Sequence, residues 1–264
     1  MRSDFEIKDR YYIDDLVKIM ALLRGKDGCP WDKAQTHSSI RQNFIEETYE
    51  VIEAIDNDDP EAMCEELGDA LLQVVFHAQM EKERERFDFD DVCDGICKKL
   101  VLRHPHIFGD ENISDAEAVG DRWNEIKKVS KGQKTGSETL NAVPKQLPAL
   151  LRCAKLQKRA ENASGYSVSK DEAMKLFDNS VSELHDVVES GKTEDYNQKV
   201  GEALFALVCL ARKLSLEPEQ CLTDSSDKFI DRFSKAEELL KEKEREFQDL
   251  PNDEILEIWQ NAKR

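Results

Sequence analysis

Helical periodicity with few interruptions is the feature that most limits what this chain can fold into. Leu16, Ile19 and Leu23 recur at the spacing of one helix face, and similar stripes follow along the sequence. The chain has 11 glycines and 7 prolines, 18 of its 264 residues, which is well below their usual combined share of about 12%. We find no alternating pattern long enough to predict a strand, so we expect an all-α fold.

Helix caps and breakers divide this pattern into segments. A polar, glycine-bearing stretch at residues 131–141 is the best candidate for a linker. We therefore predict an N-terminal domain at 1–130, a linker at 131–144 and a C-terminal domain at 145–264. The predicted helices cover approximately residues 9–24, 36–56, 61–86, 88–103, 114–131, 145–162, 170–189, 193–214, 217–246 and 252–262.

The two predicted domains resemble each other in sequence. The matched segments are 66–72 with 199–205, Lys99-x-x-x-Arg103 with Lys228-x-x-x-Arg232, and Trp123-x-x-x-Lys127 with Trp259-x-x-x-Lys263. One such match can arise by chance between helical sequences. Three matches in the same order favour a tandem duplication.

Charge and cysteine content exclude several classes of protein. Lys and Arg number 38 against 56 Asp and Glu, a net charge of −18 that disfavours nucleic-acid and anionic-membrane partners. We see no apolar run of about 18 residues and no secretory signal, so we expect a cytoplasmic protein with reduced cysteines. Cys93 and Cys97 lie one helical turn apart, but without a second Cys or His pair at zinc spacing a structural role is favoured over metal binding.

Two pairs of acidic residues are the strongest candidate for chemistry. Glu47 and Glu50 share a helix face, and so do Glu66 and Asp69. The break at 57–60 allows the two helices to fold back antiparallel, so the pairs can face each other. At about 4 Å each pair of charges repels by about 1 kcal/mol in water and by more near a low-dielectric wall. Carboxylate clusters of this kind suit Mg²⁺ or Mn²⁺ together with substrate phosphates.

A solvated acidic surface is the alternative interpretation of these residues. Gly68 within the predicted helix and the apolar stretch 71–76 after Asp69 place the acids beside a buried region, which favours a site. A di-iron site is disfavoured, because such bundles usually use Glu-x-x-His pairs and we find none in this sequence.

Basic and aromatic residues can complete a phosphate or nucleotide site. Lys99 and Arg103 share a helix face and can contact phosphate oxygens, or they can form salt bridges. Trp31 or Trp123 can stack on a base, and core packing is the alternative for either residue.

The acidic motif Glu46-Glu47-x-x-Glu50 followed by Glu66-x-x-Asp69 resembles the signature of the all-α nucleoside triphosphate pyrophosphohydrolases. The chain as a whole is similar to the MazG family, whose members carry two such domains in tandem. Supporting segments are 28–36, 65–79, 103–109 and 147–150. The resemblance implies hydrolysis of nucleoside triphosphates to a monophosphate and pyrophosphate. It also implies a homodimer in which helices of two subunits complete each four-helix site.

The resemblance also implies individual roles. The Mg²⁺ ligands would be Glu47, Glu50, Glu66 and Asp69. Lys99 and Arg103 match the family's phosphate-contacting pair and Trp123 its nucleotide-contacting tryptophan, and apart from the resemblance Trp31 and Lys127 complete the set of candidate substrate-binding residues. Glu46 is a candidate for orienting the attacking water, and a solvated helix residue is an equal alternative.

The second half departs from this pattern. It has Glu183-Leu-His-Asp186 and Lys199-Val-Gly-Glu202, with Ser182 in place of the first acid. Lys199 puts an ammonium group where a cation ligand is expected. We predict that this half does not bind Mg²⁺ properly and that Lys199 can instead bridge Glu183 and Asp186.

The second half nevertheless keeps Lys228, Arg232 and Trp259 at the matched positions. We expect catalysis in the first domain, with the second serving dimerisation or regulation. The alternatives are a nucleotide-binding protein with little turnover and a helical partner-binding protein.

Overall fold

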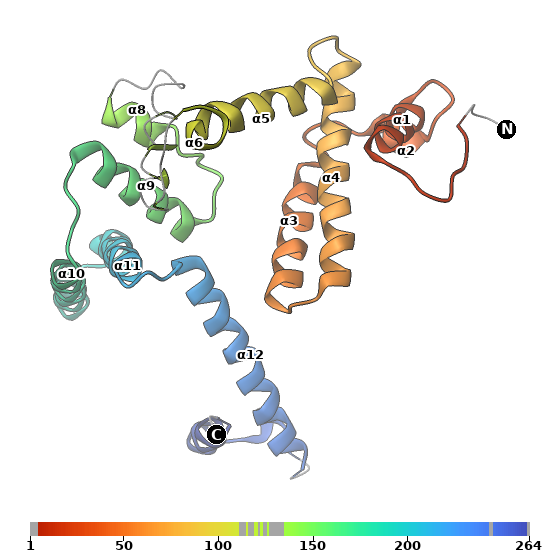
Figure 1. The fold of residues 1–264 in the computed structure, drawn as a ribbon. Coiled ribbons are helices and arrows are strands. Elements are labelled where there is room, and N and C mark those ends of the chain that lie inside the picture. The colour runs from red at the N-terminus through yellow and green to blue at the C-terminus, as the bar shows by residue number, and fades with distance from the viewer. Residues whose placement is uncertain are drawn as a thin grey trace. The chain divides into compact units, whose positions relative to one another are not determined.

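The computed structural model describes residues 5–110, 115, 119–120, 122–123, 126, 135–242 and 245–262. Its regular elements within these ranges are all helical, which confirms the predicted all-α class (Figure 1). The chain divides into two compact units, residues 1–127 and 128–264. None of the described helices combines the length and the apolar character that a membrane span requires.

A helical hairpin, α3 and α4, dominates the first unit (Figure 1). Its turn is set by Asp58, in the left-handed region at φ 52°, and by Asp59, whose carboxylate caps α4 ahead of Pro60. The helices of this unit are α1 (Ile13–Arg24), α2 (Pro30–Ala34), α3 (Arg41–Asp56), α4 (Pro60–Lys82), α5 (Phe89–Arg103) and α6 (Pro105–Phe108).

The core of the first unit lies along the C-terminal half of α4, where α1 packs against it. Its buried members are Met20, Ile40, Val75, Phe76 and Met80. Full burial of such side chains stabilises a fold by about 1.5–3 kcal/mol each. This core holds the C-terminal half of α4. The N-terminal half, which carries the acidic residues, packs against α3.

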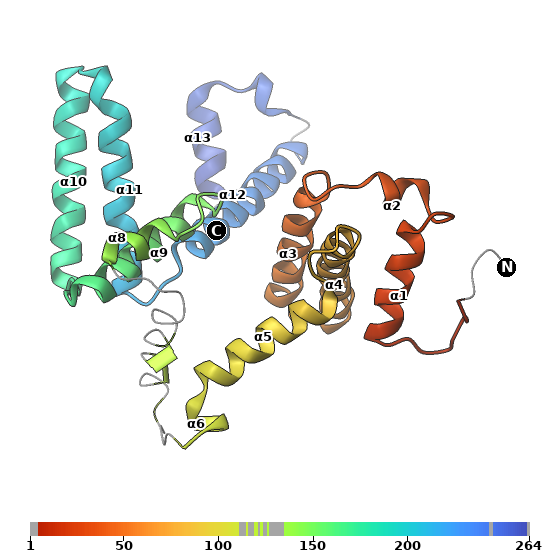
Figure 2. The ribbon, with the colours of Figure 1, turned by 90° about the horizontal axis from the view of Figure 1, so that it is seen from above.

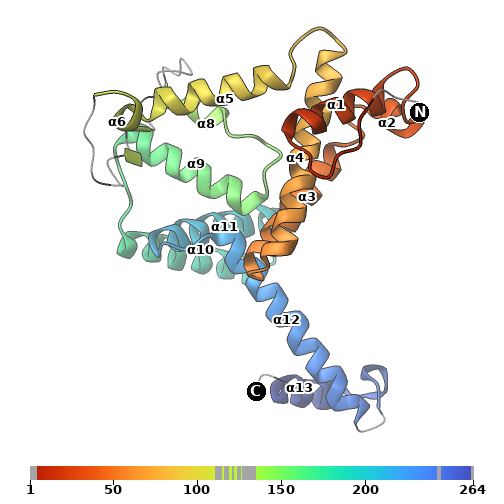
Figure 3. The same ribbon diagram turned by 45° about the vertical axis from the view of Figure 1, so that its right-hand side comes forward.

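Helices α10 and α11 lie side by side in the other unit and form a second hairpin (Figure 2). Gly191, at φ 71°, ends α10 in the left-handed conformation that glycine adopts without strain. The elements are α8 (Gly136–Asn141), α9 (Ala149–Ser164), α10 (Lys170–Ser190), a 3₁₀ turn (Thr193–Asp195), α11 (Tyr196–Lys213), α12 (Pro218–Lys241), a second 3₁₀ turn (Phe247–Asp249) and α13 (Asn252–Asn261). Helix α13 packs back against α12 (Figure 3).

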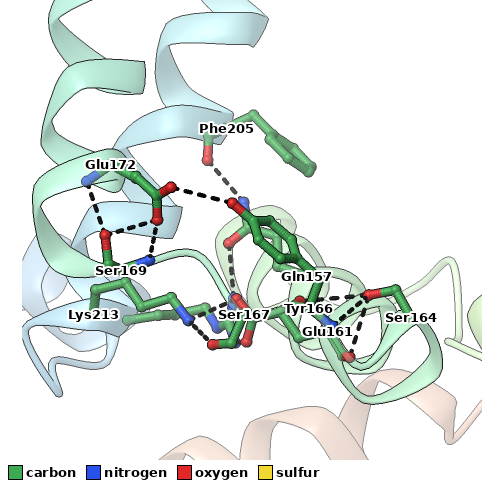
Figure 4. Close-up of polar contacts among 10 residues, drawn as sticks. Gln157, Glu161, Ser164, Tyr166, Ser167, Ser169, Glu172, Phe205 and Lys213 are labelled. Atoms are coloured by element: carbon green, nitrogen blue, oxygen red, sulfur yellow. Dashed lines mark hydrogen bonds and ion pairs between the residues drawn. The ribbon is translucent and has the colours of Figure 1, made fainter.

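Polar contacts fasten α9 to α11 in the second unit. Glu161 forms ion pairs of 2.8 Å with both Arg212 and Lys213. Gln157 donates from Nε2 to the carbonyl oxygen of Phe205 at 2.8 Å (Figure 4). Because these groups satisfy one another, the network holds the helices together and offers no open ligand site.

The structure differs from the sequence prediction at several element ends. Residues 136–141, expected within a linker, form α8, because Thr135 and Glu138 make a capping box. The helix expected to reach residue 86 ends at Lys82, ahead of a turn in which Glu85 has φ 57°. The predicted helix at 114–131 lies largely outside the described residues, and Lys127 lies outside them entirely.

Candidate metal centre

Three carboxylates converge on the first hairpin. Helix α3 supplies Glu47, and α4 supplies Glu66 and Asp69 one turn apart. One oxygen from each of the three lies within 4.8 Å of the others, and all three side chains are partly buried. The hairpin turn and the i, i+3 spacing thus bring together three of the four predicted ligands.

The electrostatics of this cluster favour a bound cation. Burial raises the pKa of Glu47, and the negative charges of Asp69 and Glu50 raise it further. Burial likewise raises the pKa of Glu66, again with a contribution from Glu50. Glu50 is exposed and lies beside the cluster of three. Oxygen donors that are partly buried and mutually repelling fit a hard divalent cation.

Gln73 also contacts the cluster, and the sequence analysis missed it. Its Nε2 donates to Oε1 of Glu47 at 3.2 Å, and its side chain is buried. Gln73 follows Asp69 by four residues on α4, so it lies on the same helix face. That spacing was the signal that could have identified it.

The other predicted site residues of the first unit make no described contact with the three acids. Glu46 and Trp31 are exposed, and Lys99 is exposed on α5. Arg103 is buried, with its guanidinium carbon 5.0 Å from the centre of the Trp123 ring. Helix α5 leads away from the α3–α4 hairpin (Figure 2). No described contact within this unit joins Lys99 or Arg103 to the carboxylates.

A histidine pair lies beyond Gln73 along α4. Nδ1 of His37 is 2.7 Å from Nδ1 of His77, and Nε2 of His37 is 2.7 Å from Oε1 of Glu81. Glu81 also accepts from Arg84 and Arg86, and the hydrogen bond with His37, followed by those with the two arginines, holds the pKa of Glu81 below its ordinary value. Burial, and then the neighbouring His37, lowers the pKa of His77.

A lysine bridges two acids of the second hairpin. Lys199 Nζ is 2.6 Å from Oε2 of Glu183 and 2.8 Å from Oε2 of Glu202. These contacts raise the pKa of Lys199 and lower that of Glu202. The predicted contact of Lys199 with Glu183 is present, but the predicted contact with Asp186 was wrong. Lys199 pairs instead with Glu202, which lies three residues later on the same helix face, and Asp186 is exposed.

An arginine–tryptophan pair recurs in the second unit. The Arg232 guanidinium lies 4.1 Å from the centre of the Trp259 ring, and its Nε donates to the Trp259 carbonyl oxygen at 2.8 Å. This contact parallels that of Arg103 with Trp123. Lys228, one turn before Arg232 on α12, is exposed, as Lys99 is on α5.

Comparison with known proteins places this chain among relatives of known family. Residues 35–108 match the MazG nucleotide pyrophosphohydrolase domain. The Bacillus subtilis protein YabN is 44% identical over 247 residues, 93% of this chain, but the match spans only half of that longer protein.

Two other relatives match along nearly their whole length. The Thermotoga maritima nucleoside triphosphate pyrophosphohydrolase/pyrophosphatase MazG is 38% identical, covering 95% of each chain. The nucleoside triphosphate pyrophosphohydrolase of Escherichia coli K12 is 39% identical, covering 96% of this chain and 97% of that protein. The chain therefore belongs to the MazG family of nucleoside triphosphate pyrophosphohydrolases.

Proposed function

We propose that the first unit hydrolyses nucleoside triphosphates to nucleoside monophosphate and pyrophosphate, using Mg²⁺ or Mn²⁺. The observation that carries this proposal is the convergence of Glu47, Glu66 and Asp69 on one hairpin. The names of the full-length relatives support the same activity. Glu50, beside the cluster, is proposed as the fourth ligand.

The divalent cation would supply positive charge to the substrate phosphates and acidify the attacking water. The carboxylates would hold that cation, and their partial burial would strengthen the attraction. Lys99 and Arg103 offset the remaining charge of the triphosphate. Glu46 orients the water, and Trp123, with Trp31 and Lys127, contacts the nucleoside.

We propose that the active form is a homodimer. The acids lie on a two-helix hairpin, and the basic residues lie on α5, which leads away from it (Figure 2). Apolar side chains of the hairpin stay exposed in a single chain, among them Ile45, Ile52, Ile55, Leu67 and Leu71. A second copy packed on this hairpin would cover these residues and complete a four-helix site. The free cysteines fit a cytoplasmic location.

Pyrophosphate release from a panel of ribo- and deoxyribonucleoside triphosphates with Mg²⁺ tests the proposal. Asp69→Asn should lower the rate by about a thousandfold or more, because a catalytic cation contributes several kcal/mol. Glu202→Gln, at the matched position of the second hairpin, should leave the rate unchanged.

Retained activity in Asp69→Asn would contradict the assignment of catalysis to the first unit. If the wild type turned over none of the nucleotides, the proposal that this protein is an enzyme would be contradicted. Thermal stabilisation by nucleotide without turnover would then identify a nucleotide-binding protein.

A further inference from the structure

Gln73 lies in contact with the carboxylate cluster but belongs to no ligand set. It follows Glu66 and Asp69 on α4 at i+7 and i+4, so all three lie on one helix face. Its side chain is 7% exposed, and its Nε2 donates to Oε1 of Glu47 at 3.2 Å. The amide therefore connects α4 to the one ligand of the cluster that α3 supplies.

The other end of this amide has no partner. Oε1 of Gln73 is buried and makes no hydrogen bond with any described residue. A buried amide oxygen without a partner is destabilising, so an apolar side chain would suit this position better for folding alone. Rotating the amide would not help, because Oε1 would then face the Glu47 carboxylate. The orientation of Gln73 is thus set by Glu47.

The second hairpin lacks this arrangement. The alignment that matches Asp69 with Glu202 places Ala206 at the position of Gln73. There Glu183, the counterpart of Glu47, is held by the Lys199 ammonium. The buried amide is therefore present in the hairpin whose acids have no bridging lysine. It is absent from the hairpin in which Lys199 forms that bridge.

We propose that Gln73 is a positioning residue for the cation site, an inference that rests on the proposed function. By occupying one oxygen of Glu47 it fixes the carboxylate so that the other oxygen faces Glu66 and Asp69. The partner groups that orient metal ligands commonly change metal affinity by about 10–100-fold when removed. In this role Gln73 acts through Glu47 and is not itself a ligand of the cation.

The test compares Gln73→Met, which keeps the length and loses the amide, with Gln73→Ala, which copies Ala206. The control is Gln79→Met, because Gln79 donates to Glu83 at 3.1 Å on the same helix. Mn²⁺ binding is measured by electron paramagnetic resonance without nucleotide, and thermal unfolding in EDTA. Steady-state rates are measured across a range of Mg²⁺ concentrations.

We expect Mn²⁺ to bind both Gln73 variants about tenfold or more weakly. The unfolding midpoint of Gln73→Met in EDTA should stay unchanged or rise, because the unpaired oxygen is gone. At saturating Mg²⁺ the KM for nucleotide should stay at the wild-type value, and Gln79→Met should bind Mn²⁺ as the wild type does.

Wild-type Mn²⁺ affinity in both Gln73 variants would overturn the inference and leave the proposed function standing. A lowered midpoint with unchanged affinity would show that Gln73 only supports the fold. A wild-type protein that binds no Mn²⁺ would overturn the inference and the proposed cation site together.

Discussion

The α3–α4 and α10–α11 hairpins share a helical layout and treat their acidic residues in opposite ways. In the first, Glu47, Glu66 and Asp69 converge without a described cationic partner. In the second, Lys199 occupies the position matched to Glu66 and lies between two carboxylates. One scaffold can therefore bridge its carboxylates with a lysine or hold them together without one, and the position of Glu66 and Lys199 distinguishes the two cases.

The hairpins also differ in the polar residues that support them. His77 and Glu81, which form a network with His37 in the first unit, are matched by Leu210 and Leu214 in the second. Partly buried polar groups at these positions raise the cost of folding unless they are well paired. The first hairpin keeps such groups at two positions where the second has leucine.

Replacing Glu66 by lysine, the residue at the matched position of the second hairpin, should have the largest effect. Glu66→Lys gives the first hairpin the ammonium group of the second, placed to bridge Glu47 and Asp69. Pyrophosphate release should fall by about a thousandfold or more, since a like charge opposes the cation. The unfolding midpoint in EDTA should rise, because the repulsion that, after burial, raises the pKa of Glu66 and Glu47 is replaced by attraction.

The matched control for this exchange is Glu65→Lys, an exposed neighbour on α4, which should retain most of the activity. A Glu66→Lys variant that retains activity, or that unfolds at a lower temperature in EDTA, would show that the two hairpins do not differ through this position.

Removing the bridging lysine of the second hairpin should have a smaller effect, limited to stability. Lys199→Met removes both contacts of the ammonium and leaves Glu183 and Glu202 to repel each other. The unfolding midpoint should fall by a few degrees, because partly exposed ion pairs contribute modestly. Pyrophosphate release should be unchanged. Lys192→Met, on the exposed turn after α10, serves as the control; an equal loss in both variants would contradict a specific bridge.

The acidic site was predictable from sequence because it depends on local geometry. Helical spacing places Glu66 and Asp69 on one face, and the break before Pro60 allows α4 to fold back against α3. One partner of Lys199 was mispredicted, although the i, i+3 spacing of Lys199 and Glu202 on α11 was a local signal; which acid of α10 the lysine reaches depends on how the two helices pack. Gln73 was missed because it cannot titrate and lies within an apolar run. Contacts such as His37 with His77 join residues 40 positions apart, which a one-dimensional pattern does not reveal.

The smallest predicted effect concerns His77, which belongs to the network with His37 and Glu81 and is matched by Leu210 in the second hairpin. Burial and the neighbouring His37 hold the pKa of His77 below its ordinary 6.5, so the unfolded chain binds more protons near that pH. Stability from neutral His77 is therefore present above about pH 6.5 and is lost as the pH falls toward the lower folded pKa. His77→Leu, which copies Leu210, should reduce the fall in unfolding midpoint between pH 7.5 and 5.5.

His185→Leu is the control, because His185 is exposed on α10 and lies 3.7 Å from Glu189. Glu81 contributes in a separate window, since its lowered pKa places its loss of stability below about pH 4.5. Glu47 and Glu66, whose pKa values are raised, contribute a pH dependence of stability in the opposite direction. Both acids are present in the variant and in the wild type, so the difference between the two isolates His77. An unchanged difference between the two pH values would show that protonation of His77 does not distinguish the first hairpin from the second.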